Sequence, residues 1–482
     1  MLIFKLAFRN LQRHSRKTAL LGSLIATGIG LLFVVNAVFQ GSKQGLESSL
    51  VYSLTGDMAL SQKAAFSFSL FGSEIPVVSE YEGIPQFAEF SDIWPKLSGL
   101  QNLEKAAPVV SGLAKLSIGR FSVNSALFGV EPDSYFYVNK DIKIASGKPA
   151  LISEHGVFLN SVIAAQAEEE LGRPLKPGEP ILLSMYSQGS FKLREGYFAG
   201  VHQYVSRTEA LDRVVLVDPM LLRALSGYTL GNRLKNADDA LPEYDNFDLD
   251  ELFSTSMDIL TDGTEETSLG QLEAKLADTE ERDLAASVDE SAWSFVLLKA
   301  KPGARNKLQK EVAAMVKELS PNIRLLSWRD AAGISALLIF ALQYVFYIGL
   351  GFISLGAILV IMNALVISVL ERVPEIGTMR SLGAGRPFIR NIFMLESLLL
   401  TGGSAMAGLI IAVIVSTIMA RAGIKLHNPL LISLFGGETL QPSFDLFSVL
   451  MHIAMALMAA SVSWIYPVRL AMRIKPVNAM NG

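Results

Sequence analysis

Residues 331–384 read AAGISALLIFALQYVFYIGLGFISLGAILVIMNALVISVLERVPEIGTMRSLGA. The first forty residues carry no charged side chain, and the remaining fourteen carry four. A transmembrane helix needs about 20 apolar residues, and forty helical residues extend about 60 Å against a hydrocarbon core of about 30 Å. The stretch therefore predicts a membrane helix that continues beyond the bilayer as a stalk and ends in a charged loop. A break near Gly349-Leu350-Gly351 is the alternative.

The composition of the chain also points to a membrane protein. Half of its 482 residues are hydrophobic and 18% are charged, against about 25% charged residues in soluble domains. The chain has no cysteine, which excludes disulfides, thiolate catalysis and cysteine–zinc sites. Its five histidines are scattered, and the net charge of −4 provides no basic field for nucleic acid.

Three further apolar stretches are long enough to cross a bilayer: residues 18–40, 391–420 and 447–466. Together with 331–370 they predict an α-helical membrane protein with four transmembrane helices. Buried helices of a soluble protein are the alternative for all four, and a signal peptide is the alternative for the first. Residues 41–330, between the first and second of these helices, are then expected to form a large α+β domain.

The charge distribution predicts the orientation. Residues 1–17, 371–390 and 467–482 together hold 12 basic and 2 acidic residues, whereas residues 41–330 hold 28 basic and 41 acidic ones. Because positively charged loops stay inside, both termini and the 371–390 loop are expected in the cytoplasm. The 41–330 domain and the short 421–446 loop are expected outside, in the periplasm if there is one.

The external domain is predicted to mix strands and helices. Its β-branched and apolar runs are bounded by Gly, Pro and Asp, and residues 238–290 contain 18 acidic and two basic residues. We expect these residues to form a solvated acidic insert. The predicted strands are Ala114–Ile118, Ser125–Val130, Ile181–Ser184, Gly196–Val201, Val214–Val217 and Phe295–Lys299, and the predicted helices are Ser161–Leu171 and Ala304–Leu319.

Two patterns at the amino-terminal end predict contacts. Residues 1–17 place apolar and basic side chains on opposite faces of a helix, which suits the surface of an anionic leaflet. Gly22, Ala26 and Gly30 recur every four residues, a spacing that lets helices approach closely. We expect these three residues to pack in a dimer, with glycines of the second membrane helix as possible partners: Gly349, Gly351 and Gly356.

The 371–390 loop is the most informative segment for function. Pro374 interrupts the preceding helix, and a short helix from Glu375 to Leu382 is expected to end at Gly383. Such a helix can lie along the membrane and dock in a groove of another protein. An ordinary polar turn between membrane helices is the alternative.

The segment EIGTMRSLGA, residues 375–384, resembles the E-I-G-x-x-R-A-L-G-A coupling motif of the MacB/FtsX/LolCDE superfamily of ABC transporter permeases, with Ser381 where alanine is usual. Glu396 matches a family glutamate. Residues 466–476, 9–11 and 125–132 are similar to the family's terminal Y-P-A pattern, its R-N-L start and its G-V-D-P element. The layout is closest to LolC/LolE-like permeases, and the resemblance is weakest over residues 220–290.

This resemblance implies a type VII, mechanotransmission permease: a dimer of four-helix subunits with MacB-like periplasmic domains. A separate cytoplasmic ATPase then acts on each subunit through a coupling helix. Ile376, Met379 and Leu382 are expected to fill the ATPase groove, and Glu375 and Arg380 to orient the helix. The expected coupling residues are Glu375, Ile376, Gly377, Met379, Arg380, Ser381, Leu382, Gly383 and Ala384.

The chain is not expected to be an enzyme. A P-loop requires G-x-x-x-x-G-K-[ST], and the one Gly-Lys pair, Gly147-Lys148, is followed by Pro149 on the external side. We therefore expect this chain to bind no cofactor or metal, and ATP and Mg to be used by the partner ATPase.

The expected function is lipoprotein release or export by a multi-pass inner-membrane permease. The expected partners are cytoplasmic ABC ATPases, a second permease (a homodimer or a heterodimer), membrane lipids and a lipoprotein or lipophilic cargo, but no nucleic acid. One alternative is a MacB-like efflux permease working with a periplasmic adaptor. A non-transport receptor or scaffold, such as an FtsX-like regulator, is the alternative from a different class.

Overall fold

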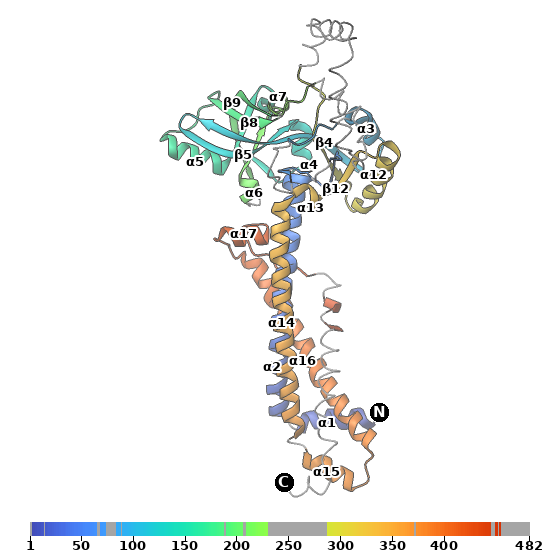
Figure 1. Ribbon diagram of the computed structural model, residues 1–482. Helices are drawn as coiled ribbons and strands as arrows, with labels where there is room; N and C mark the ends of the chain where they lie inside the picture. Colours follow the sequence, from blue (N-terminus) through green and yellow to red (C-terminus); the bar gives the residue numbers. More distant parts are fainter. Residues whose placement is uncertain are drawn as a thin grey trace, which may run out of the picture. The chain divides into compact units, whose positions relative to one another are not determined.

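The computed structural model describes residues 2–13, 15–64, 68–73, 83–87, 89–187, 189–205, 209–229, 287–370, 373–444, 449–451 and 453–454 (Figure 1). The chain forms two compact units, which are described separately below. Unit 1 comprises Met1–Glu47 and Leu338–Gly482, and unit 2 comprises Ser48–Leu337. The predicted acidic insert lies outside the described residues as far as residue 286. So do most of the predicted fourth span, 447–466, and all of the tail.

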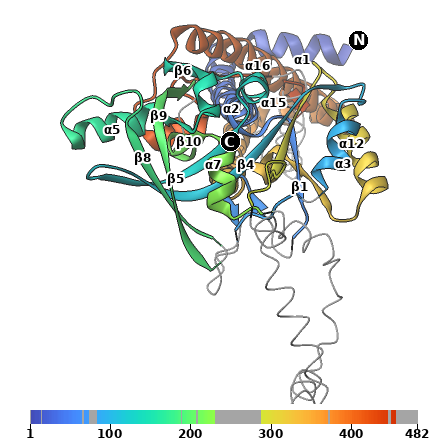
Figure 2. The same ribbon diagram turned by 90° about the horizontal axis from the view of Figure 1, so that it is seen from above.

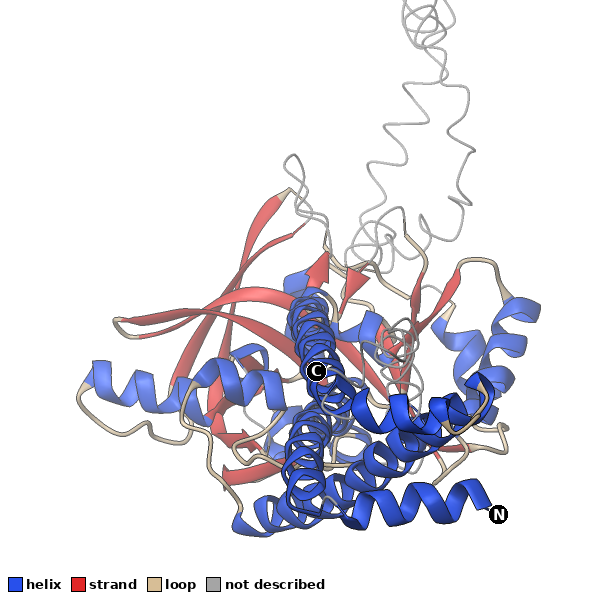
Figure 3. Ribbon diagram, turned by 90° about the horizontal axis from the view of Figure 1, so that it is seen from below, coloured by secondary structure: helices blue, strands red, loops and turns tan. Residues whose placement is uncertain are grey.

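Unit 2 contains all the named strands (red in Figure 3). A separate small hairpin is formed by β2 (Phe68–Ser69) and β3 (Gly72–Ser73). The other strands form one sheet: β1 (Met58–Gln62), β4 (Leu103–Ile118), β5 (Phe121–Val130), β6 (Ile142–Gly147), β7 (Gly156–Asn160), β8 (Pro180–Ser187), β9 (Ser190–Tyr204), β10 (Val214–Val217), β11 (Phe295–Ala300) and β12 (Ile323–Ser327).

The long strand β4 belongs to both halves of this sheet. Its first half pairs antiparallel with β11, and the sheet continues through β1 to β12. Its second half pairs with β5 and β8. From β5, the pairing passes through β10, β7 and β9 back to β8, so that six strands form a closed ring (β4, β5, β8 and β9 are prominent in Figure 2).

Each half has its own hydrophobic core. Buried apolar side chains of the ring strands pack together with those of α5 (Ser161–Leu171) and α7 (Pro219–Ser226). The other core lies between β1, β11 and β12 and the helices α3 (Phe90–Leu97) and α12 (Arg305–Leu319). Successive side chains of a strand point to opposite faces of the sheet. Residues of β8 are accordingly exposed and buried in turn along much of the strand, and the buried ones contribute to the core.

Local capping fixes where several helices of unit 2 begin. Asn160 accepts a hydrogen bond from the Val162 N–H at the start of α5, and Asp218 accepts one from the Met220 N–H at the start of α7. Ser327 and Asp330 form a capping box on α13 (Trp328–Ala332). The remaining short elements of unit 2 are η1 (Val51–Thr55), α4 (Pro132–Val138), η2 (Pro149–Ser153) and α6 (Glu209–Asp212).

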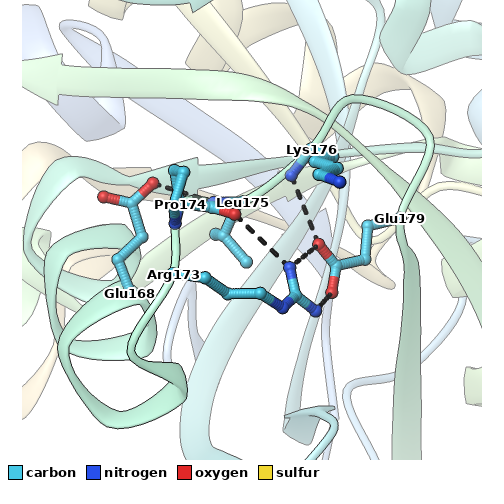
Figure 4. Close-up of polar contacts among 6 residues, drawn as sticks. All are labelled: Glu168, Arg173, Pro174, Leu175, Lys176 and Glu179. Carbon is cyan, nitrogen blue, oxygen red and sulfur yellow. Dashed lines mark hydrogen bonds and ion pairs between the residues drawn. The ribbon is translucent and has the colours of Figure 1, made fainter.

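The turn after α5 is held by a polar network (Figure 4). The Arg173 guanidinium forms an ion pair with Glu179, and the hydrogen bonds of this pair lower the pKa of the Glu179 carboxyl. The backbone N–H groups of Lys176 and Leu175 donate to Glu179 and Glu168, at 3.2 and 3.0 Å. The network therefore fixes the path of the chain from α5 into β8.

All six predicted strands and both predicted helices of the external domain are present in unit 2, which is confirmed as α+β. Val214–Val217 and Ser161–Leu171 have the predicted bounds. The sequence patterns missed the two short strands β2 and β3, and they missed β1, β6, β7 and β12 of the main sheet. In β7 every residue is buried, so this strand has no alternation to detect.

Unit 1 is built from helices. Its described helices are α1 (Leu2–Arg13), α2 (Ser15–Leu50), α14 (Ile334–Leu370), α15 (Val373–Ser381), α16 (Arg386–Ala422) and α17 (Pro429–Phe435), of which α2 and α14 end or begin within unit 2. The predicted stretch 331–370 is one helix only from Ile334, because α13 ends at Ala332 and Gly333 has a φ of +65°. The break near Gly349, which was the alternative to one continuous helix, is absent from α14. The predicted helix 1–17 ends at Arg13.

Two segments among the described residues are long and apolar enough to cross a membrane, Thr18–Thr55 and Pro387–Ala422. They contain the predicted first and third spans. A shorter apolar stretch, Gln343–Gly356, lies within α14.

The small residues of α2 pack against α16 of the same chain. A Cβ added at Gly22 would lie 3.0 Å from Ser404 Oγ, and one at Gly30 would lie 3.0 Å from the Gly408 carbonyl oxygen. A Cβ added at Gly408 would overlap the Ala26 carbonyl oxygen. This face of α2 was expected at a dimer interface, but the structure fills it from within the chain.

The expected partner glycines of α14 show no such contact. Among the described residues, and apart from the backbone of α14 itself, no atom lies within 4 Å of a Cβ added at Gly349, Gly351 or Gly356. The physical reason for the different partner is that α16 also carries small residues one turn apart, Ser404 and Gly408, so that two small-residue faces meet.

A buried polar cluster lies where β9 of unit 2 meets α4. The His202 and Tyr204 rings are in edge-to-face contact with centroids 5.3 Å apart, and Tyr135 is also fully buried. The His202 side chain is fully buried as well. Burial therefore lowers the pKa of His202 to about 3.

We expect replacement of Gly30 by leucine to destabilise unit 1 by about 1–3 kcal/mol, because the new side chain must separate α2 from the backbone of α16. The control is Gly28→Leu in the same helix, where nothing lies within 4 Å of an added Cβ. Thermal unfolding of the purified proteins in detergent should show a lower Tm for Gly30→Leu alone. Equal Tm values for the two variants would contradict the α2–α16 contact.

The low pKa of His202 predicts an acid-sensitive unit 2. The folded-state pKa of His202, about 3, lies below the ordinary value of 6.5. The contribution of the neutral, buried imidazole to the free energy of unfolding is therefore complete above pH 6.5. That contribution is lost as the pH falls from 6.5 to about 3, by up to about 1.4 kcal/mol per pH unit. His202→Phe should flatten this part of the stability profile, measured by denaturant unfolding at a series of pH values. His427→Gln, at an exposed histidine, serves as the control and should retain the slope.

Candidate functional site

The predicted short helix after Pro374 is present as α15, Val373–Ser381, and Pro374 lies in its first turn. Proline is favourable there because the first helical N–H groups have no intrahelical acceptor. The Thr378 hydroxyl donates to the Glu375 carbonyl oxygen at 2.8 Å, and the Ser381 hydroxyl donates to the Thr378 carbonyl oxygen at 2.8 Å. Both hydroxyls thus bond within the helix.

The end of α15 is a Schellman motif. The Ala384 N–H donates to the Met379 carbonyl oxygen at 3.0 Å, and the Gly383 N–H donates to the Arg380 carbonyl oxygen at 3.1 Å. Gly383 has a φ of +92°, which explains why glycine stands at this position. The apolar contact typical of the motif is made by Met379 and Ala384, which belong to one cluster.

The inner face of α15 packs on the start of α16. Ile376 is 3% exposed and lies in a cluster with Ile389 and Phe393, against which Met379 and Ala384 pack. Gly377 is also buried. Burial of one isoleucine contributes about 1.5–3 kcal/mol. These contacts therefore hold the inner face of α15 against the start of α16.

The outer face of α15 is formed by Pro374, Thr378 and Ser381, at positions i, i+4 and i+7, and by Leu382. Leu382 is 88% exposed. Glu375 and Arg380 are half-buried, at the edges between the two faces, and Gly383 is exposed.

This placement corrects the roles expected from the sequence. Ile376 and Met379 were expected to enter a partner's groove, but they face α16 of the same chain. Leu382 remains as the apolar side chain available to a partner. Ile389 and Phe393 lie one turn apart in the sequence, and this spacing was a signal for the internal contact, since apolar residues at i and i+4 share a helix face.

The other predicted functional residues lie elsewhere. Gly22, Ala26 and Gly30 pack on α16, as described above, and Glu396 is buried in α16, one turn beyond Phe393. Among the residues that the structure describes, no three histidine, aspartate or glutamate side chains gather as a metal site would.

The chain is similar in part to two solved structures. One is the periplasmic region of MacB from Actinobacillus actinomycetemcomitans, with 11% identity and a TM-score of 0.30, covering 58% of this chain and 92% of that one. The other is the extracellular domain of the noncanonic ABC-type transporter YknZ from Gram-positive bacteria, with 11% identity and a TM-score of 0.28, covering 56% of this chain and 99% of that one.

A curated relative matches part of the chain. The macrolide export ATP-binding/permease protein MacB 2 of Aeromonas hydrophila is 32% identical over 120 residues, which are 25% of this chain. The chain spans only 16% of the length of that relative. Residues 347–476, which contain α15 and α16, match the family model of the FtsX-like permease C-terminal domain.

Proposed function

We propose that this chain is the permease subunit of a MacB/FtsX-type ABC transporter, driven by a separate cytoplasmic ATPase that docks on α15. The observation that carries the proposal is the division of α15 into two faces. One face is fixed to α16 by Ile376, and the other presents Leu382 at 88% exposure. An exposed leucine on a short, rigid helix is suited to a partner's groove.

The proposal assigns the coupling step to helices. A force applied to the outer face of α15 is passed to α16 through the apolar cluster, because packed interiors have low compressibility. ATP and Mg are used by the partner, and this chain supplies the helix that the partner moves. A second permease copy, identical or different, completes the proposed assembly.

The orientation is supported by α1. Lys5, Arg9 and Arg13 are exposed on this helix, while Ala7 is buried. No acidic residue precedes Glu47 in the chain. An uncompensated basic face next to membrane-spanning helices favours the anionic cytoplasmic leaflet. In this arrangement α15 is cytoplasmic, unit 2 is external, and the protein is located in the inner membrane.

For the cargo we propose a lipoprotein or another lipophilic molecule, on the basis of the LolC/LolE-like layout of the sequence. The match to a macrolide exporter favours a second candidate, efflux of a small amphiphile with a periplasmic adaptor. The two differ in which compound stimulates the ATPase. A triacylated lipopeptide should increase turnover for the first candidate and a macrolide for the second, with both assayed on the purified complex in nanodiscs.

Leu382→Asp should weaken binding of the ATPase by about 2 kcal/mol or more, roughly 30-fold, because an unpaired charge would enter an apolar groove. The protein should still insert, since Leu382 makes no buried contact. Co-purification of the ATPase and its turnover are the measurements. Leu113→Asp, at another exposed leucine, is the matched control in unit 2. Normal retention of the ATPase by Leu382→Asp would exclude docking through this face.

The proposed topology predicts opposite labelling of two exposed serines. Ser190 lies at the start of β9 and Ser381 at the end of α15, and the chain has no native cysteine. In spheroplasts, an impermeant maleimide should label Ser190→Cys at once and Ser381→Cys only after the membrane is opened. The reverse pattern would invert the orientation and remove α15 from the cytoplasm.

A further inference from the structure

The segment after α16, residues 423–444, packs on α2 backbone against backbone. A Cβ added at Gly41 would overlap the Gln441 carbonyl oxygen, and one at Gly45 would meet the Phe435 carbonyl oxygen. From the other side, a Cβ added at Gly436 would overlap the backbone of Leu46. Close contact at all three points therefore depends on the absence of a side chain.

Two sets of hydrogen bonds reinforce this contact. The Ser443 N–H donates to the Ala37 carbonyl oxygen of α2 at 2.9 Å. The Ser42 hydroxyl donates to the Leu434 carbonyl oxygen, and Gln343 Nε2 of α14 donates to the Ser42 hydroxyl at 3.2 Å. Ser42 and Gln343 are almost fully buried. The 423–444 segment is thus tied to both long helices, α2 and α14.

The segment is itself braced. Gly423 ends α16 in the left-handed region, with a φ of +56°. The beginning and the end of the segment then pair through their backbones. The Leu426 N–H donates to the Glu438 carbonyl oxygen at 2.7 Å, and the Leu440 N–H donates to the Ile424 carbonyl oxygen at 2.9 Å. Its turn after α17 is closed by a hydrogen bond from the Gly437 N–H to Ile432 at 3.1 Å. A displacement of the end of α16 is therefore carried through the segment rather than absorbed in it.

We propose that the 423–444 segment passes movement of α16 to the outer part of α2, with Gly41, Gly45 and Gly436 as positioning residues and the Gln343–Ser42–Leu434 hydrogen bonds holding α14 in the same junction. This inference rests on the proposed function as an ATP-driven permease. Backbone-to-backbone contact suits the role because no flexible side chain lies between the moving parts. A passive loop between two membrane helices requires none of these contacts.

The first experiment tests whether the close contact between α2 and the 423–444 segment depends on glycine at position 41. Leu434 is buried against α2, and in the cysteine-free chain Leu434→Cys is a specific reporter. Adding Gly41→Ala should increase the maleimide labelling rate of this thiol by about tenfold, equivalent to about 1.4 kcal/mol of local stability. Gly28→Ala in α2 and Gly402→Ala in α16, where an added Cβ meets nothing within 4 Å, should leave the rate unchanged. An unchanged rate in Gly41→Ala overturns the proposal.

The second experiment tests whether the junction passes movement. Single cysteines at exposed positions of unit 2, Lys115, Ser153 and Ser190, are labelled in the full complex with its co-purified ATPase, nucleotide-free and vanadate-trapped. The wild-type background and Gly28→Ala should show nucleotide-dependent labelling rates. Gly41→Ala should lose this dependence while keeping the bound ATPase and its basal turnover. Ser42→Ala, which removes only a hydroxyl, should reduce the dependence without steric overlap.

The outcomes separate the two ideas. If the wild-type background retains its ATPase but shows no nucleotide-dependent rate, the proposed function fails, and the inference that rests on it fails with it. If the wild-type background responds, and Gly41→Ala opens the junction yet responds equally, the inference alone is overturned. Loss of the response in Gly41→Ala and a reduced response in Ser42→Ala, with the ATPase still bound and its basal turnover intact, supports the inference.

Discussion

The close approach of α2 to the backbone of α16 and of the segment that follows it is the constraint on which unit 1 depends. From Gly22 to Gly45, small residues of α2 meet Ser404, Gly408, Phe435 and Gln441. In a bilayer, apolar side chains gain little by leaving lipid for a neighbouring helix, so association relies on packing and hydrogen bonds. Small residues provide both, because they bring carbonyl oxygens and N–H groups of the two partners into contact. The helix pair is therefore sensitive to a single added methyl group.

Under the proposed function, close packing also makes α15 suited to receive force from a partner. A free amphipathic helix would absorb a push by tilting. Here Ile376 and Met379 pack on Ile389 and Phe393, and the Schellman motif at Gly383 fixes the connection to α16. The outer face carries three small side chains, Pro374, Thr378 and Ser381, and Leu382. Rigidity on one side and accessibility on the other are the two requirements of a coupling element.

The sequence predicted the parts that depend on local pattern. Alternation and β-branched runs located six strands of unit 2, Pro374 and Gly383 located α15, and uncharged runs located three long helices. The sequence did not predict which helix packs against a given face of another helix. Gly22, Ala26 and Gly30 gave a correct signal for close helix packing, but spacing alone cannot tell α16 of the same chain from a second subunit. Likewise, Ile376 and Leu382 are equally apolar in sequence, and only the position of α16 decides that one is buried and the other exposed.

The packing partner of the 423–444 segment was also not predictable from its own sequence. Its sequence, with two glycines in a row and a proline at 442, is typical of a short polar connection. Yet Gly436 and Gly437 have different surroundings: a Cβ at the first would overlap α2, whereas a Cβ at the second would meet nothing within 4 Å. Gly41 and Gly45 continue the small-residue face of α2 beyond Gly30, and this continuation was the available signal that something must lie against it. A row of small residues that extends past the expected bilayer thickness indicates a protein contact rather than a lipid one, because lipid exposure does not require glycine at successive turns.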